Sequence, residues 1–274
     1  MSEFTISQRQ FLERFFTAAV NIYGIIDLRT LWNVYMSMKM SGVEEMVPMH
    51  RSMMLAYIDQ EASASHRWQV MEINVIDPEQ SPDPMKRVLV EGGVKNSQAK
   101  DLNLYRSVIA ARKGKKVSVP ADFFSYADYM RNLEQDDLTR FLMNLQVTAE
   151  EMMDRNDADH RIATQHRGCS LQELSFDTVE VRNWIGSGML DHGADRPGAP
   201  IALLFQITDW SLRSGYLSPE KSLNYLADSL RQMGVDLSKK QAHELHRLFS
   251  RYANRTALWR EWGASIKDLQ ETGN

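Results

Sequence analysis

The stretch from Leu248 to Gln270 constrains the fold most, because it alternates large aromatic residues with signals that stop and start helices. Gly263 is placed to end one turn, and Ser265 with Asp268 has the spacing of a capping box that begins a short helix. Side chains this large beside such signals predict a segment that closes a core rather than an exposed tail. The aromatic residues concerned are Phe249, Tyr252, Trp259 and Trp262.

Chain length and composition set the outer limits. With 274 residues, of which 43% are hydrophobic and 25% charged, the chain is long enough for one large or two ordinary domains of a soluble protein. Its single cysteine, Cys169, excludes an intrachain disulfide framework and a multi-cysteine zinc site. The longest apolar runs, such as 202–205, are far shorter than the roughly 20 residues of a membrane span, and residues 1–9 lack a signal-peptide core. We therefore expect a cytoplasmic protein with no membrane partner.

The first 95 residues show the element order of a winged-helix domain. Apolar residues recur at helical spacing in three stretches and then alternate in two strand-like stretches around a proline-rich tip. Gly24 is placed to stop the first helix, Asp27 to cap the second, and Pro48 fits only in the first turn of the third. The expected helices cover 7–23, 28–35 and 44–60, with Ile25 and Ile26 as a short extended bridge, and the expected strands cover 66–76 and 87–91.

The rest of the sequence is largely helical in character. Residues 97–112 are expected to form a helix that ends in a basic run. Capping boxes predict helix starts at Thr148 with Glu151 and at Ser238 with Gln241. The predicted fold class is mostly α, with a winged-helix-like N-terminal unit that holds one β-hairpin and a helical C-terminal unit. The predicted boundaries are 1–95 for the winged-helix-like domain, 96–117 for a basic helical connector and 118–274 for an all-helical domain.

Charge is spread unevenly along the chain, whose net charge is −4. Residues 93–120 carry seven basic groups and one acidic group, whereas residues 121–236 carry ten basic and nineteen acidic groups. Phosphate contacts require lysine and arginine, so the first of these regions, the basic belt, is the candidate nucleic-acid-binding surface. Alternatively, it is a solvated helix end whose lysines complement the helix dipole. The belt consists of Lys95, Lys100, Arg106, Arg112, Lys113, Lys115 and Lys116.

The third expected helix, 44–60, would be the recognition helix of a winged-helix domain. Acidic residues at its ends (Glu44, Glu45 and Asp59) outnumber its one arginine, Arg51, which makes it a poor reader of DNA. Its methionine-rich face is better suited to a core or to an adaptable contact with another protein. The methionines are Met46, Met49, Met53 and Met54.

Two pairs of histidines are weak candidates for metal ligands. His243 and His246 are three apart on one expected helix, with no third ligand nearby in the sequence. His160 and His166 lie in a stretch of alternating charges, and both pairs are explained more simply as parts of solvated helix faces. The sequence has no nucleophile elbow, phosphate-binding loop, dinucleotide fingerprint or HExxH motif. We therefore expect no catalytic residue and no cofactor, with a metal-dependent hydrolase as the enzymatic alternative.

Three segments resemble an uncharacterised group of Gram-positive bacterial proteins, many of which end in a small zinc-binding SEC-C motif. The segments are NIYGIIDLRTLWNVY at 21–35, ARKGKKVSVPADFFSYADYM at 111–130 and ANRTALWREWGASIKDL at 253–269. The SEC-C motif itself is absent, because the sequence holds no cysteine besides Cys169. The resemblance implies an N-terminal winged-helix-like unit, a basic connector and a helical C-terminal unit, and it implies no catalytic or metal-binding residue.

These observations favour a non-enzymatic intracellular protein that interacts with or regulates other proteins through protein–protein contacts. One alternative is a nucleic-acid-associated regulator that contacts phosphates through residues 95–116. Another is an inhibitor from a phage or mobile element, whose acidic region, 121–236, would occupy a basic groove on another protein. Bacterial or phage origin fits each of these hypotheses.

Overall fold

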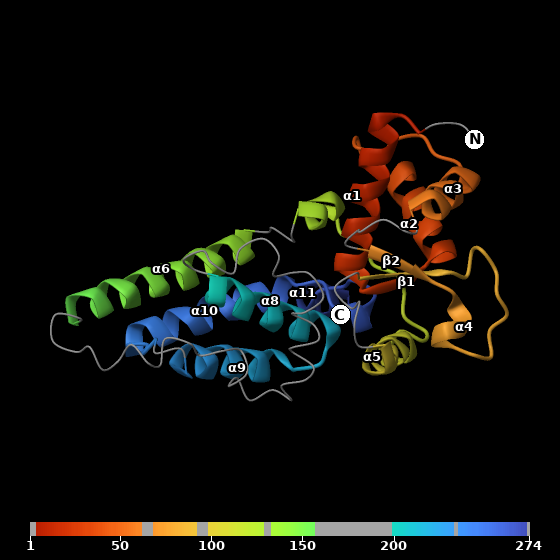
Figure 1. Cartoon of the computed structure of the whole chain (residues 1–274). Coiled ribbons are helices and arrows are strands. Elements are labelled where there is room, and N and C mark those ends of the chain that lie inside the picture. The colour runs from red at the N-terminus through yellow and green to blue at the C-terminus, as the bar shows by residue number, and fades with distance from the viewer. Residues whose placement is uncertain are drawn as a thin grey trace. The chain divides into compact units, whose positions relative to one another are not determined.

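The computed structural model describes residues 4–61, 68–91, 98–128, 133–156, 199–232 and 235–272. These residues are mostly helical, with a small antiparallel sheet, which confirms the predicted mostly-α class (Figure 1). Contacts divide the chain into two compact units. The first unit comprises 1–93, 98–131 and 257–274, and the second comprises 94–97 and 132–256.

The first unit begins with elements that the local sequence predicted well. Helix α1 (Ile6–Tyr23) starts at a capping box formed by Thr5 and Gln8, and ends at Gly24, whose φ is 69°. Strand β1 (Ile25–Asp27) follows at once. Helix α2 (Leu28–Met40) begins where the Asp27 side chain accepts a hydrogen bond from the Thr30 amide, at 2.9 Å.

Helix α3 (Arg51–Glu61) starts seven residues later than the predicted 44–60, so that prediction was wrong at its first end. Proline at position 48 disfavours helical backbone before it. The segment before the helix is instead held by Tyr35, whose hydroxyl donates to the Val47 carbonyl at 3.1 Å and accepts from the Met49 amide at 2.9 Å. The Tyr35 hydroxyl therefore satisfies two backbone groups of the non-helical chain that precedes α3.

The sheet confirms the predicted hairpin and adds a third strand. Strands β2 (Trp68–Met71) and β3 (Val88–Glu91) pair antiparallel, with Trp68 opposite Glu91. Strand β1 pairs with the other edge of β3, giving the order β1-β3-β2. The predicted strand 66–76 is shorter than expected, because a short helix, α4 (Ile73–Ile76), begins two residues after β2 ends. The winged-helix assignment itself stays a prediction.

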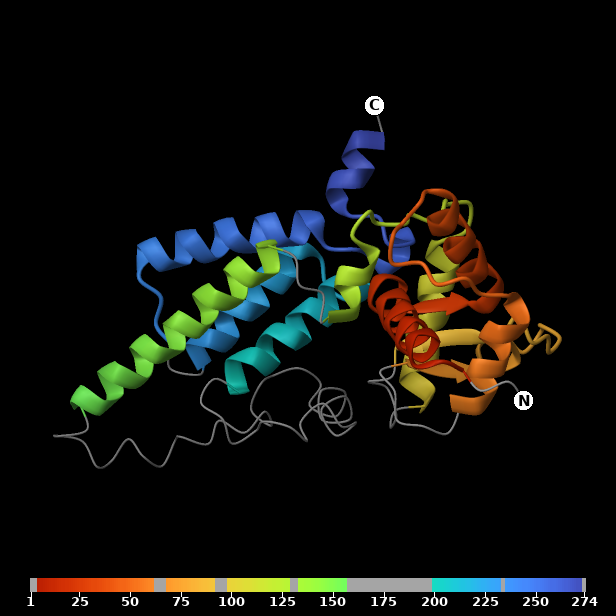
Figure 2. The same ribbon diagram turned by 90° about the horizontal axis from the view of Figure 1, so that it is seen from above.

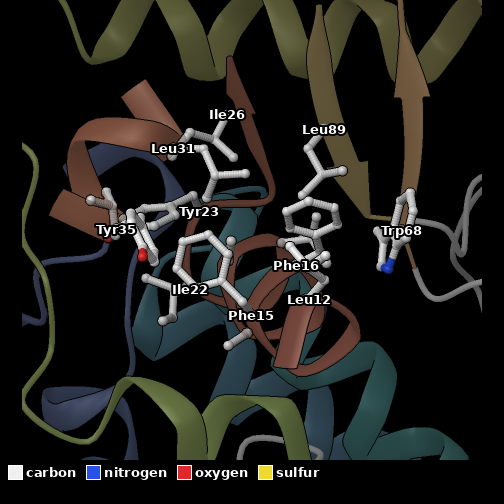
Figure 3. Close-up of a cluster of buried hydrophobic side chains, with 14 of the residues drawn as sticks. Leu12, Phe15, Phe16, Ile22, Tyr23, Ile26, Leu31, Tyr35, Trp68 and Leu89 are labelled. Carbon is white, nitrogen blue, oxygen red and sulfur yellow. The ribbon is translucent and has the colours of Figure 1, made fainter. Parts of the chain in front are cut away.

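The core of the first unit is built around α1, which is buried on most of its faces. Figure 3 shows Phe15 beside Tyr35 of α2, and Phe16 beside Trp68 of β2. The Phe16 and Trp68 rings meet edge to face, with 5.1 Å between their centres. A 3₁₀ helix, η2 (Phe123–Asp128), closes another side, and the Phe123 ring stacks on Phe15 at 5.4 Å. Most of the α1 side chains are thus fixed by segments that are distant in sequence.

The described residues of the second unit form four long helices. They are α6 (Leu133–Asn156), α8 (Ala199–Ser214), α9 (Pro219–Gln232) and α10 (Lys239–Arg255), and they pack along one another in Figures 1 and 2. The capping box of Ser238 with Gln241 begins α10 as predicted. The helix start predicted at Thr148 was wrong, since α6 runs through that residue without a break. No helix of the described residues is long and apolar enough to cross a membrane.

The remaining elements belong to the first unit. Helix α5 (Gln98–Ala111) follows the sheet, and after α10 come a 3₁₀ turn, η4 (Trp259–Glu261), and helix α11 (Ile266–Thr272). Ser265 and Asp268 form the predicted capping box of α11. The stretch 248–270 does close a core, but its two halves belong to different cores, with Phe249 and Tyr252 in the second unit and Trp262 in the first. These compact units therefore differ from the predicted boundaries at 95 and 117.

Candidate functional site

The most highly connected polar side chain that the sequence analysis singled out is Arg112, which follows the last turn of α5. Its guanidinium donates from Nε to the Trp259 carbonyl and from Nη1 to the Ile25 carbonyl, each at 2.5 Å, and from Nη2 to the Tyr23 carbonyl. The residue is only 3% exposed. Each nitrogen of the guanidinium thus holds a different backbone carbonyl, from the end of α1, from β1 and from η4.

An aromatic ring covers the face of this guanidinium. The Arg112 Cζ atom lies 4.2 Å from the centre of the Trp262 ring, and the Trp262 indole donates back to the Arg112 carbonyl at 3.3 Å. Burial lowers the pKa of Arg112 to about 9, which leaves it charged at neutral pH. We call Arg112 with its three carbonyls and Trp262 the arginine seat.

The arginine seat corrects the prediction that Arg112 belongs to an exposed phosphate-binding belt. The sequence could not reveal this, because the run from Arg112 to Lys116 has the composition of a solvated helix end. The three carbonyls come from positions about 90 and 150 residues away, and no local pattern encodes such a contact. Arg112 is a structural cation of the first unit.

The other members of the basic belt each have different surroundings. Arg106 lies on the exposed side of α5, and its Nε donates to the Ile76 carbonyl at the end of α4, at 2.7 Å. Lys115 pairs with Glu261 at 2.6 Å. Lys113 and Lys116 are exposed, the side chain of Lys100 lies outside the described set, and Lys95 falls outside the described residues. Positions 113 and 116 are thus the two of the seven that present exposed lysines outside the contacts described above.

The predicted metal ligands are not brought together. His243 and His246 are both exposed on α10, where Glu244 between them forms an ion pair with Arg247 at 2.6 Å. This hydrogen bond to Arg247 lowers the pKa of Glu244. His160 and His166 lie outside the described residues. Within the part of the chain that the structure describes, no three His, Cys, Asp or Glu residues are grouped so as to hold a metal ion.

The surface of α3 carries charges that pair with neighbouring basic residues. Asp59 receives a hydrogen bond from Arg87 at 2.6 Å, and Glu61 one from Arg9 at 2.7 Å. On the inner side of the helix and just before it, Met54 and Met49 are buried in the core, as one of the two interpretations of the methionine face expected. The arginine side chains near this helix are thus engaged by carboxylates or, for Arg51, lie over the Trp32 ring at 5.7 Å.

An exposed apolar surface lies on α2, and the sequence analysis missed it. Trp32, Met36 and Met40 are four residues apart, a spacing that places them on one face of a helix. Met40 is 85% exposed and Met36 is 36% exposed, while Trp32 is partly buried and stacks on Tyr35 with 5.0 Å between ring centres. We call these three residues the α2 ridge. The four-residue spacing is present in the sequence, but the sequence does not show which helix face stays exposed.

A buried polar cluster lies inside the second unit. Arg213 donates from Nε to both carboxylate oxygens of Asp209, at 2.9 Å each, and the Tyr252 hydroxyl donates to Asp209. Burial raises the pKa of Asp209, while the contact with Arg213 acts in the opposite direction. Both charged residues lie on α8 and are at most 3% exposed. The carboxylate therefore has a buried cation and a buried hydroxyl as its partners, an arrangement that fixes α8 against α10.

Comparison of the chain with protein-family models, with curated proteins and with solved structures finds no match in any of the three. The resemblance described for residues 21–35, 111–130 and 253–269 stays a prediction. All three segments nevertheless contribute to the arginine seat, through Tyr23 and Ile25, Arg112, and Trp259 and Trp262.

Proposed function

We propose that this chain is a non-enzymatic protein that interacts with or regulates other proteins, and that its N-terminal unit makes the contact through the α2 ridge. The observation that carries the proposal is the exposure of Met36 and Met40 on the face that also holds Trp32. Large apolar side chains gathered on one helix face favour contact with another protein, and methionine adapts its shape to a partner surface.

The arrangement of α3 supports a protein partner over DNA. The first unit runs α1, β1, α2, α3, β2, α4 and β3, and apart from the short helix α4 this is the order expected of a winged-helix domain. In such a domain α3 would lie in the major groove, where phosphate contacts need unpaired lysine and arginine. Here Arg87 and Arg9 are paired with acidic residues of α3 itself, so this helix offers a nearly neutral surface.

Fewer of the described residues support the alternative, a nucleic-acid contact through the basic belt. Arg112 holds carbonyls of its own unit, Lys115 is paired with Glu261, and Arg106 is bonded to the Ile76 carbonyl. Exposed Lys113 and Lys116 are therefore the described positions best placed to bind phosphates. Two phosphate contacts give only a weak interaction, because both the affinity and its dependence on salt grow with the number of phosphates neutralised. The inhibitor hypothesis rests on the acidic region 121–236, much of which lies outside the described residues.

Site-specific photo-crosslinking separates these functions. A benzophenone amino acid is placed at Met40 on the α2 ridge, at exposed Gln60 on α3 or at Lys116 on the belt, each time in the whole chain. The variants are irradiated in extract of the native host, and the adducts are digested with protease or with nuclease. We expect a discrete protein adduct at Met40 and a much weaker one at Gln60.

The matched variants test whether the adduct depends on the ridge. Met36→Glu should reduce the Met40 adduct about tenfold or more, because it places a charge within the apolar contact, whereas Ser37→Glu adds the same charge at a neighbouring exposed position and should leave the adduct intact. A nuclease-sensitive adduct at Lys116 with none at Met40 would replace this proposal by the nucleic-acid alternative. An adduct at Met40 that Met36→Glu does not change would also contradict it.

A further inference from the structure

We infer that the first unit reaches its native structure only when residues 257–265, which we call the strap, are docked on it. The strap lies beyond the second unit in the chain, yet its residues belong to the first unit and Ala257 is part of its core. The inference concerns how the unit is assembled and does not depend on the proposed partner.

The first contact that supports the inference is the packing of the Trp259 side chain. This side chain is 2% exposed, and its indole donates to the Asn21 carbonyl at 3.2 Å. The ring lies against the backbone of Gly24, where an added Cβ would come within 2.2 Å of ring carbon Cδ2. Gly24 also has a positive φ of 69°. A glycine at this position therefore both allows the backbone turn that ends α1 and leaves room for the Trp259 ring. The strap therefore fills a space that the end of α1 leaves open.

The second contact is the arginine seat itself. Without the strap, Arg112 would keep the carbonyls of Tyr23 and Ile25 but would lose the Trp259 carbonyl and the Trp262 ring. A buried guanidinium with part of its partners removed carries a large desolvation cost. The strap thus supplies partners that a buried cation of the first unit requires.

The third contact joins the strap to the extended chain that follows α5. The Ser118 amide donates to the Trp262 carbonyl at 3.0 Å, and Lys115 pairs with Glu261. Gly263 then passes so close to α1 that an added Cβ would lie 2.5 Å from Cγ2 of Ile22. A backbone hydrogen bond, a salt bridge and close packing therefore all join the strap to the first unit.

Chain order gives these contacts a consequence for folding. Residues 132–256 form a separate unit and lie between the strap and the rest of the first unit. A nascent chain must therefore be synthesised through both units before the first one can close. Folding of the first unit therefore depends on residues that follow the second unit in the chain.

Four glycine variants of the whole chain test the inference, because all four glycines have a positive φ and their surroundings differ. Gly24→Ala and Gly263→Ala place a methyl group against the strap contacts, whereas Gly42→Ala and Gly114→Ala have similar positive φ angles and no atom within 4 Å of the new Cβ. The readout is native-state hydrogen exchange, with the amides of α1 reporting on the first unit and those of α10 on the second.

We expect the two control variants to lower the protection of the α1 amides by about tenfold, the usual penalty of a left-handed backbone for alanine. Gly263→Ala should lower it by a further ten- to hundredfold, although residue 263 is far from α1 in sequence, because the added methyl group is overpacked. Protection of the α10 amides should be unchanged in all four variants.

Trp262→Leu is the milder variant, in case Gly263→Ala does not fold, and should lower α1 protection by about tenfold with α10 unchanged. The inference is overturned if Gly263→Ala or Trp262→Leu exposes the strap amides alone while α1 keeps the protection of its control. It is also overturned if α1 and α10 lose protection together, because the strap would then not act on the first unit in particular.

Discussion

The two units bury a positive charge in different ways. In the first unit, the guanidinium of Arg112 is held by an indole ring and by three hydrogen bonds, all of which go to backbone carbonyls. In the second unit, Arg213 is held by the carboxylate of Asp209 one helical turn away, which is in turn bound by Tyr252. The first arrangement joins distant stretches of backbone, and the second joins side chains.

Other hydrogen bonds follow the same division. In the first unit, Tyr23 donates to the Ser118 carbonyl at 2.8 Å and Asn21 to the Tyr126 carbonyl at 2.7 Å, across about 100 residues of sequence. In the second unit, Thr208 donates to the Leu204 carbonyl, within its own helix. A unit assembled from separate segments needs side chains that fix distant backbone, whereas a contiguous bundle satisfies its backbone within each helix.

The largest effect is expected for Arg112→Ala, which leaves three buried carbonyls without a donor. Each unsatisfied buried group costs about 1–3 kcal/mol, so we expect the free energy of unfolding of the first unit to fall by about 5 kcal/mol. Hydrogen exchange of α1 amides measures this. Lys113→Ala, at the adjacent exposed position, should change it by less than about 0.5 kcal/mol. Equal effects of the two variants would contradict a special role for the arginine seat.

A somewhat smaller effect is expected for Asp209→Ala in the second unit, about 4 kcal/mol, because Arg213 would remain buried without its carboxylate. A triple variant then compares the buried polar cluster with apolar side chains at the same positions. Replacing the whole cluster by apolar residues (Asp209→Leu, Arg213→Met and Tyr252→Phe together) should restore stability to within about 1 kcal/mol of the unmodified protein. Urea unfolding followed through α10 amides tests both. A triple variant as unstable as Asp209→Ala would show that the pair itself is needed.

An intermediate effect is expected for Tyr35→Phe in the first unit. The hydroxyl satisfies the buried Met49 amide and the Val47 carbonyl, so its removal should cost about 2 kcal/mol. Ser37→Ala, exposed on the same helix, should cost less than about 0.5 kcal/mol. Faster exchange confined to residues 43–50 would confirm that Tyr35 holds this segment in particular, whereas an unchanged rate there would refute it.

The smallest effect is expected for Glu261→Gln, which removes a half-exposed ion pair with Lys115. Such pairs contribute about 0.2–1 kcal/mol and are screened by salt, so the loss should disappear at about 1 M NaCl. Glu271→Gln, in the more exposed pair with Lys267, should cost even less. A loss for Glu261→Gln that persists in high salt would mean that Glu261 acts through something other than this charge pair.

Features set by neighbouring residues could be predicted from the sequence. Gly24 ends α1, Asp27 caps α2, and Ser265 with Asp268 begins α11, because each of these signals acts within one turn of the backbone. The antiparallel pairing of β2 and β3 also followed from alternation around a proline-rich connection.

Features set by distant residues could not be predicted in this way. The chain before α3 is held by the hydroxyl of Tyr35, and the burial of Arg112 depends on carbonyls at positions 23, 25 and 259. The capping-box pattern at Thr148 also failed, since α6 continues through that residue. For the candidate surface, the spacing of the α2 ridge was visible, but its exposure depends on what packs against the helix.

The insertion of the second unit between two parts of the first affects how the protein can vary in length. Docking of the strap closes a loop that contains residues 132–256, and the entropy of loop closure grows only with the logarithm of loop length. Doubling that loop would cost roughly 0.6 kcal/mol. Relatives could therefore carry a longer or shorter intervening region, while the residues around the arginine seat would have little freedom to change.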